Sequence, residues 1–293
     1  MKGETVEDNN NLALQTALHH LKLDGFCVLE GIIPADQVGA IHDDIVAAQT
    51  AHNAAAEAEQ AKTRARGHRI GARGVGALKQ VINFTQSFAP YLAHPRIMEI
   101  VEALFGHYAR ISCTDCVINH PGNERNYWHA DWPYNQTNAS HIPTPYPDAL
   151  LHLSTIWMLS PFSGATGGTL VVPGSHRCAD NPSAASIPEV DNQAVYPTET
   201  NVSGAAGAVL LYDSRLWHAV ASNKSDQPRV ALIVRYAPWW LNLNPTMIGR
   251  PEHTHMVVET GGKNYESTPL RLDVFEALSD DVKPLYRHWV AAE

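Results

Sequence analysis

Apolar residues recur at helical spacing in the first third of the chain and give way to short strand-like runs further on. Between residues 36 and 48, Val38, Ile41 and Ile45 lie three or four positions apart, which predicts one face of an amphipathic helix. From residue 109 to 240, short runs rich in Val, Ile and Leu alternate with turn residues. This pattern favours strands. The order, helices first and strands afterwards, predicts an α+β protein with a mainly β core.

The chain has 293 residues, of which 44% are hydrophobic and 17% charged. These values are typical of a globular protein with a sizeable core. We expect one domain over residues 1–293, made of a helical N-terminal part (about 8–107), a strand core (about 109–240) and a C-terminal extension (241–293).

Composition also bears on partners and location. A formal net charge of −9 argues against nucleic acid as a partner, because phosphate binding needs a positive surface. No apolar run approaches the length that crosses a bilayer, and no export segment follows the N-terminus. Four cysteines in a chain of this length do not predict a disulfide framework. We therefore expect a cytoplasmic protein without a membrane partner, either a monomer or a homodimer.

Three residues in two separate segments suggest a metal site. His129 and Asp131 lie two positions apart in the run Tyr-Trp-His-Ala-Asp-Trp, and His218 lies in Leu-Trp-His-Ala-Val. On extended backbone, residues two apart point to the same face, so His129 and Asp131 can address one ion, with His218 as the third ligand. Two imidazoles and a carboxylate on one face of an octahedron are typical of non-haem Fe(II) oxygenases.

The same His-x-Asp motif occurs at His42 and Asp44. Those residues fall within the helical pattern, which would splay their side chains around the helix, so we interpret that copy as a solvated surface. His141, His152 and His176 are rival ligands by residue type, and a structural hydrogen-bonding role is favoured for His176 in its Pro-Gly-Ser-His turn.

Arg229 follows His218 by eleven positions and begins a run rich in Val, Ile and Leu. Many oxygenases of this kind draw electrons from a 2-oxo acid, whose distal carboxylate needs a planar, two-pronged cation. Arginine provides that geometry, whereas lysine is only a point charge. The alternative is that Arg229 merely lies at the surface where a strand begins.

Several segments between about residues 20 and 240 resemble the phytanoyl-CoA dioxygenase-like (PhyH) family of Fe(II)/2-oxoglutarate-dependent oxygenases. They are an opening strand and helix, a Gly-rich strand and turn, and a strand that ends at the last histidine: residues 23–38, 167–176 and 207–218. The resemblance implies a double-stranded β-helix, a jelly-roll and cupin-like barrel, buttressed by the N-terminal helices.

The resemblance also implies roles for single residues. His129, Asp131 and His218 match the iron ligands, and Arg229 matches the residue that binds 2-oxoglutarate. Further pocket positions match Trp157, Cys116 and Gln80. Some relatives carry a serine where this chain has Val220, and related halogenases replace the carboxylate at Asp131 with a small residue. The implied cofactor is Fe(II), with 2-oxoglutarate and O2 as cosubstrates.

The expected reaction is hydroxylation or another oxidation of a C–H bond in a small organic molecule, with release of succinate and CO2. The arginine- and glycine-rich stretch 62–76 suggests a lid that recruits an anionic substrate; a solvated loop is the alternative. The proline-rich stretch 132–149 is expected to rim the entrance, where tryptophans would form apolar walls: Trp128, Trp132, Trp239 and Trp240. The alternative function is a cupin-like metal hydrolase or isomerase, or a non-catalytic binding protein.

Overall fold

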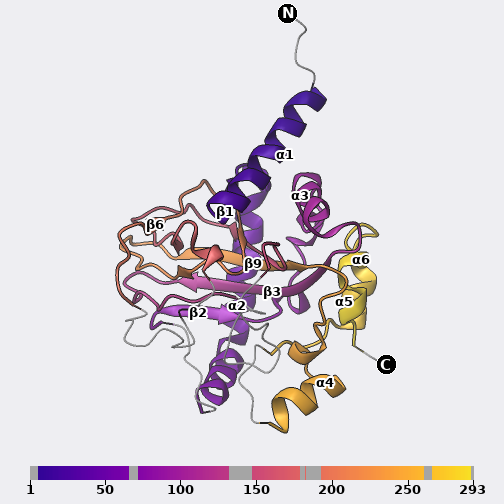
Figure 1. Ribbon diagram of the computed structural model, residues 1–293. Coiled ribbons are helices and arrows are strands. Elements are labelled where there is room, and N and C mark those ends of the chain that lie inside the picture. Colours follow the sequence, from indigo (N-terminus) through magenta and orange to yellow (C-terminus); the bar gives the residue numbers. More distant parts are fainter. Residues whose placement is uncertain are drawn as a thin grey trace, which may run out of the picture.

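A computed structural model of the protein describes residues 6–65, 72–131, 147–178, 182, 193–260 and 266–291. Helices dominate the first hundred residues, and the short helical segments of the C-terminal part follow the last strand (Figure 1). The α-helices are α1 (Val6–Leu23), α2 (Ala35–Ala65), α3 (Pro95–Phe105), α4 (Pro251–His253), α5 (Leu272–Ala277) and α6 (Lys283–Tyr286). Shorter 3-10 or π turns are η1 (Val81–Asn83), η2 (Ala89–Tyr91), η3 (Ser175–Arg177), η5 (Asn244–Thr246), η6 (Thr254–Val258) and η7 (Arg287–Trp289).

The strands form two antiparallel sheets. The six-stranded sheet has the order β1-β7-β4-β9-β3-β2, and the three-stranded sheet has the order β6-β5-β8. The strands of the first sheet are β1 (Phe26–Leu29), β2 (Val75–Leu78), β3 (Arg110–Asn119), β4 (Leu153–Met158), β7 (Val209–Asp213) and β9 (Arg229–Ala237). Those of the second are β5 (Leu170–Val171), β6 (Thr200–Asn201) and β8 (His218–Ala219).

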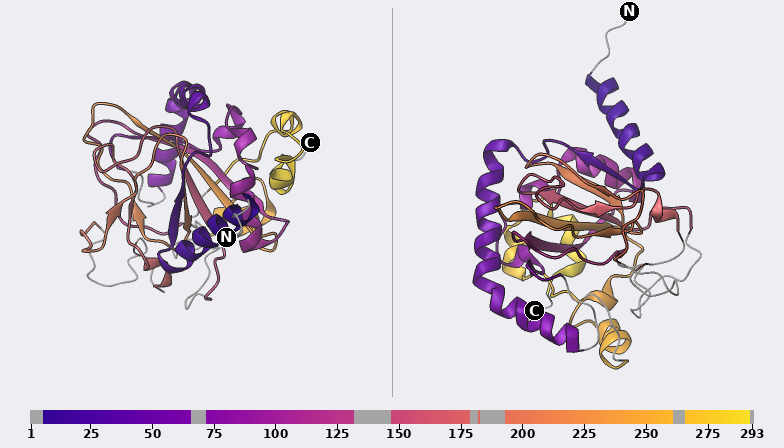
Figure 2. Two further views of the ribbon diagram at one scale, coloured as in Figure 1. Left: turned by 90° about the horizontal axis from the view of Figure 1, so that it is seen from above. Right: turned by 90° about the vertical axis from the view of Figure 1, so that its left-hand side faces the viewer.

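Each face of the large sheet packs against a different layer. One face joins α1, α2, α3 and the C-terminal helices in a helix-facing core that contains Ile45, Ile97, Trp157 and Leu232. The opposite face contributes Ile156 and Tyr212 of β4 and β7 to an inter-sheet core, which also holds Val171 of β5. The expected helices therefore buttress one side of the sheet, and α2 runs along the body of the molecule (Figure 2).

The C-terminal extension packs on the helix-facing core. Val274, Leu285, Tyr286 and Trp289 are all buried there, and the Tyr286 hydroxyl forms a 2.7 Å hydrogen bond with that of Thr114 on β3. The extension thus closes an apolar face of the sheet.

Most of the expected elements are present. The helical pattern of residues 36–48 lies within a longer helix, α2, and the strand-like runs expected from residue 109 onward begin with β3. The expected strand from residue 207 to His218 is wrong, because β7 ends at Asp213 and His218 belongs to β8 in the other sheet. Asp213 terminates β7 by accepting a hydrogen bond from the Arg215 backbone on its side chain and one from Leu216 on its carbonyl.

In the described part of the chain, every helix is too short or too polar to cross a lipid bilayer.

Candidate metal and cosubstrate site

The structure brings His129, Asp131 and His218 together. One ligand atom from each residue lies within 4.8 Å of the other two, and all three line a cavity of about 530 Å³. The imidazole centroids of His129 and His218 are 4.1 Å apart, and Nε2 of His218 lies 3.7 Å from Oδ1 of Asp131. Three donors this close can hold one metal ion.

Backbone pairing between two extended segments creates this cluster. His129 and His218 exchange two backbone hydrogen bonds of 3.0 Å, and the Asp131 amide donates to the Ser214 carbonyl at 2.8 Å. His129 forms an isolated bridge instead of a regular strand, yet the backbone is extended enough to place residues 129 and 131 on one side. His218, on β8, lies directly across this pairing from His129.

Backbone carbonyls orient both imidazoles. Nδ1 of His218 lies 2.9 Å from the Leu216 carbonyl, and Nδ1 of His129 lies 3.3 Å from that of Tyr127. Nδ1 therefore carries the proton in each ring, and the Nε2 lone pairs remain for a metal. Burial, with a contribution from His218, lowers the pKa of His129 to about 3. Burial also lowers the pKa of His218, against the attraction of Asp131, so both rings are neutral near pH 7.

Asp131 is held by groups that are not ligands. Its Oδ2 accepts hydrogen bonds from the Ser154 hydroxyl at 2.7 Å and the Tyr212 hydroxyl at 3.0 Å, and its Oδ1 accepts one from Nη2 of Arg235 at 2.7 Å. Burial opposes ionisation, but the charge of the Arg235 guanidinium and the hydrogen bond from Ser154 help to hold the pKa of Asp131 below its ordinary value. The carboxylate is therefore charged at neutral pH.

Sequence reasoning missed Arg235 as a site residue. The sequence feature that could have found it is its even spacing from Arg229 on the same strand, β9. Alternate residues from Arg229 to Arg235 line the cavity, whereas Val230 and Leu232 between them face the helix-facing core. Even spacing on a strand places both arginines on one face.

Arg229 lies in the same cavity and is 3% exposed. Its guanidinium carbon lies 4.5 Å from the centre of the Phe162 ring, and its Nε has no hydrogen-bond partner. No carboxylate of the described residues pairs with it, and burial lowers its pKa to about 9. A charged, buried guanidinium without a counter-ion fits the carboxylate of a bound 2-oxo acid.

Two residues expected in the cosubstrate pocket lie elsewhere. Trp157 points into the helix-facing core, where its Nε1 donates to the Thr155 hydroxyl at 2.9 Å, and its neighbour Ile156 lines the cavity instead. Cys116 is buried in the same core, while Val117 lines the cavity. In both cases the pleat of the strand turns the expected side chain to the opposite face.

Gln80 also lies outside the cavity wall. Its backbone amide donates to the Asp115 carboxylate at 2.8 Å, and its side-chain amide lies 3.4 Å from the Thr268 carbonyl. Its φ of 48° is left-handed, which turns the chain after β2 so that Lys79, not Gln80, lines the cavity.

The rival histidines form structural hydrogen bonds. His152 is fully buried between the hydroxyls of Ser112 and Ser214, at 2.8 and 2.7 Å from its two ring nitrogens. Nε2 of His176 lies 3.2 Å from the Lys22 carbonyl. His141 lies outside the described residues.

The tryptophan walls were predicted wrongly in the described part of the chain. Trp128 is fully buried in a small core with Trp217, and Trp239 and Trp240 are exposed and do not line the cavity. Trp132 and most of the proline-rich stretch lie outside the described residues.

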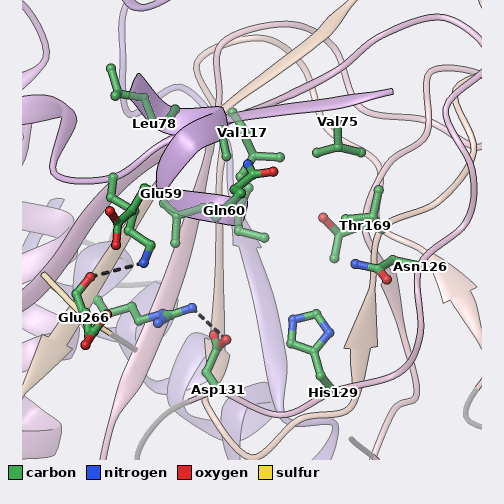
Figure 3. A pocket seen from close by; sticks show the side chains of 18 of the residues that line it. Glu59, Gln60, Val75, Leu78, Val117, Asn126, His129, Asp131, Thr169 and Glu266 are labelled. Atoms are coloured by element: carbon green, nitrogen blue, oxygen red, sulfur yellow. Dashed lines mark hydrogen bonds and ion pairs between the residues drawn. The ribbon is translucent and has the colours of Figure 1, made fainter. Parts of the chain in front are cut away.

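The far wall of the cavity comes instead from α2, β2 and the C-terminal extension. It includes small and apolar residues, among them Ala55, Ala56 and Ile248, and Phe84 adds an aromatic ring from the end of η1. Figure 3 shows Glu59 and Glu266 on one side of the cavity, away from Asn126 and Thr169, with His129 and Asp131 between them below. Of the basic stretch, residues 66–71 lie outside the described part, and Arg73 is exposed and paired with Glu124.

Comparison with known proteins identifies the family of the chain. A family model described as Phytanoyl-CoA dioxygenase (PhyH) matches residues 21–231. An uncharacterized protein of Mycobacterium tuberculosis is 25% identical over 235 residues, which cover 78% of this chain and 76% of that protein. An ectoine dioxygenase of Bordetella parapertussis is 26% identical over 256 residues, with 78% of each chain covered.

Among solved structures, HygX from Streptomyces hygroscopicus with nickel and 2-oxoglutarate bound is similar in fold. The TM-score is 0.55 at 16% sequence identity, and the match covers 77% of this chain and 87% of HygX. The α+β architecture with its antiparallel core is therefore that of the double-stranded β-helix oxygenases, as expected.

Proposed function

The chain belongs to the phytanoyl-CoA dioxygenase (PhyH) family of Fe(II)- and 2-oxoglutarate-dependent oxygenases, which consume O2, and from this premise we propose that it oxidises a C–H bond of a small organic molecule. Iron is held by His129, Asp131 and His218. The distal carboxylate of 2-oxoglutarate binds Arg229.

One observation carries the proposal: a single cavity contains both the three-donor cluster and a buried arginine that pairs with no carboxylate of the described residues. A metal hydrolase has use for the cluster but not for that arginine. A 2-oxo acid needs both, because its carboxylate and keto oxygens bind the metal while its distal carboxylate needs a cation.

When bound, iron and 2-oxoglutarate supply the activation of O2, with release of succinate and CO2 and oxidation of one C–H bond. The protein's own residues prepare the site. Neutral imidazoles present Nε2, and Ser154, Tyr212 and Arg235 fix the carboxylate of Asp131. Apolar side chains of Val117, Ile156 and Ile233 line the cavity and would limit the access of water to the reacting bond.

The cavity suggests the general nature of the substrate. About 530 Å³ must hold both the cosubstrate and the substrate, which favours a small or medium-sized organic molecule. The cavity wall includes apolar side chains at Val117, Ile156 and Ile233. Glu59 and Glu266 lie on the side away from Asn126 and Thr169 (Figure 3). We infer a substrate that has both an apolar portion and a polar group.

The test is anaerobic addition of Fe(II) and then 2-oxoglutarate to the metal-free protein. We expect the weak visible charge-transfer band of an iron-bound 2-oxo acid. Arg229→Met should raise the 2-oxoglutarate concentration for half-saturation about 100-fold, because each lost charge-assisted contact in a buried site costs a factor of ten or more.

The matched control is Arg125→Met, which removes an arginine that pairs with Glu199 at 2.8 Å and does not line the cavity. It should leave the band and its half-saturation unchanged. Absence of the band in the wild-type protein, with tight Zn(II) binding instead, would overturn the proposal in favour of a cupin-like hydrolase or binding protein.

A further inference from the structure

Arg235 is the only described cation that contacts a member of the metal cluster. Its Nη2 lies 2.7 Å from Oδ1 of Asp131, and the side chains of the pair are 14% and 4% exposed. Arg229 shares its strand and its face but has no such carboxylate partner among the residues that the structure describes. Two arginines six residues apart in one cavity thus differ in their partners: Arg235 pairs with Asp131, and Arg229 pairs with no described carboxylate.

The two oxygens of Asp131 are engaged unequally. Oδ2 accepts two O–H donors, from Ser154 at 2.7 Å and Tyr212 at 3.0 Å. Oδ1 accepts a hydrogen bond from Arg235 and is the oxygen 3.7 Å from Nε2 of His218. A carboxylate oxygen has two lone pairs, so Oδ2 is filled while Oδ1 can accept Arg235 and still face the histidines.

We propose that Arg235 is a positioning residue: it holds Oδ1 of Asp131 while Ser154 and Tyr212 occupy Oδ2, and the carboxylate so fixed would ligate the iron through one oxygen and keep a coordination position open. The inference rests on the proposed function, because it assumes iron at this cluster. Arg235 acts through Asp131 and does not itself ligate the metal.

The open coordination position matters because O2 needs a place on the iron beside the protein ligands and the 2-oxo acid. Three protein ligands with one atom each leave three of six octahedral positions. A chelating 2-oxo acid takes two of them, and O2 needs the third. A carboxylate that bound through both oxygens would fill that third position, and it would have to turn away from Arg235, Ser154 and Tyr212 to do so.

The test uses the full-length protein loaded anaerobically with Co(II), whose visible absorption reports coordination number and geometry. Spectra are recorded with and without 2-oxoglutarate, and succinate release is measured in parallel with the Fe(II)-loaded protein. Arg235→Met removes the donors and the charge, and Arg235→Lys restores the charge. Arg125→Met, outside the cavity, is again the matched control.

In Arg235→Met we expect one metal per chain but an altered Co(II) spectrum in the presence of 2-oxoglutarate. The kcat of succinate release should fall at least tenfold, while KM for 2-oxoglutarate stays within about twofold, since Arg229 is intact. Arg235→Lys should return both readouts part of the way, and Arg125→Met should match the wild type.

A wild-type spectrum and kcat in Arg235→Met would overturn the inference. If that variant does not fold, Arg235→Gln replaces it, because a neutral amide is a weaker donor than a guanidinium. A wild-type Co(II) spectrum and kcat in Arg235→Gln would also overturn the inference. Failure of the proposed function looks different, since the wild-type protein would then show no Fe(II)·2-oxoglutarate band at all.

Discussion

At the scale of single residues, the candidate site depends on side chains that support the ligands. The Tyr212 hydroxyl donates to Asp131 and lies 3.4 Å from Nε2 of His218, so it contacts two of the three proposed ligands. Burial, together with the Asp131 charge, raises the pKa of Tyr212 well above 10. The phenol therefore keeps its proton and acts as a donor throughout the working pH range.

Replacing Tyr212 with Phe removes this donor and keeps the ring. We expect the dissociation constant for Fe(II) to rise by about tenfold, because partners of metal ligands typically contribute 10- to 100-fold in affinity. Anaerobic competition with a chromophoric chelator measures the change. Unchanged affinity in a folded variant would show that Ser154 and Arg235 suffice to hold Asp131.

At the scale of elements, β7 is anchored at its start by Gly207. The Gly207 carbonyl accepts hydrogen bonds of 3.0 Å from the backbone amides of Ile32 and Ile33. Gly207 has φ of +94°, and a Cβ there would lie 2.3 Å from the Ile33 carbonyl oxygen. Glycine is thus required both for the backbone conformation and for the close approach of the segment after β1.

Gly207→Ala should lower the free energy of unfolding by about 3 kcal/mol, because it combines a left-handed backbone with a clash against main-chain atoms. Denaturant unfolding of the metal-free protein measures the loss. The control is Gly31→Ala, where φ is +66° but nothing lies within 4 Å of the added Cβ; it should cost only about 1 kcal/mol. Equal losses would mean that the close approach carries no cost.

At the scale of the whole molecule, stability depends on pH through buried histidines. His152 lies between two hydroxyls inside the protein, and burial lowers its pKa to about 3. The unfolded chain has an ordinary histidine pKa of about 6.5. The unfolded state therefore binds one more proton between these values, and the stability present above pH 6.5 is lost as the pH falls towards 3.

Replacing His152 with Gln should lower stability at pH 7 but flatten its pH dependence. The wild-type free energy of unfolding should fall more steeply between pH 6 and 4 than that of the variant, by about 1.4 kcal/mol per pH unit. Urea unfolding at several pH values gives both slopes. Parallel slopes would show that His152 takes up its proton without unfolding.

Ligand binding should stabilise the folded protein in two separable steps. At 100 times its dissociation constant, each of Fe(II) and 2-oxoglutarate adds about 2.7 kcal/mol, so anaerobic melting temperatures should rise with each addition. Arg229→Met should keep the increment from the metal and lose most of that from 2-oxoglutarate. Loss of both increments would mean that Arg229 supports the fold of the site and not only the cosubstrate.

The sequence by itself determined the features that depend on spacing along the chain. Two-residue periodicity placed His129 and Asp131 on one side of extended backbone, and helical periodicity located α2. The chemical type of a residue also needs no coordinates: the guanidinium eleven positions after His218 offers a planar, two-pronged donor that matches a carboxylate in geometry. These inferences concern neighbours in sequence, for which backbone geometry alone suffices.

Tertiary structure decided which face of each strand meets the cavity. All six residues of β4 are buried, so no contrast of polar and apolar positions shows that Ile156 faces the site and Trp157 the helices. Likewise, Arg235 becomes part of the site only because β9 runs past Asp131, and α2 supplies a cavity wall only through packing. Alternation defines two faces of a strand, but only long-range contacts between segments determine what each face meets.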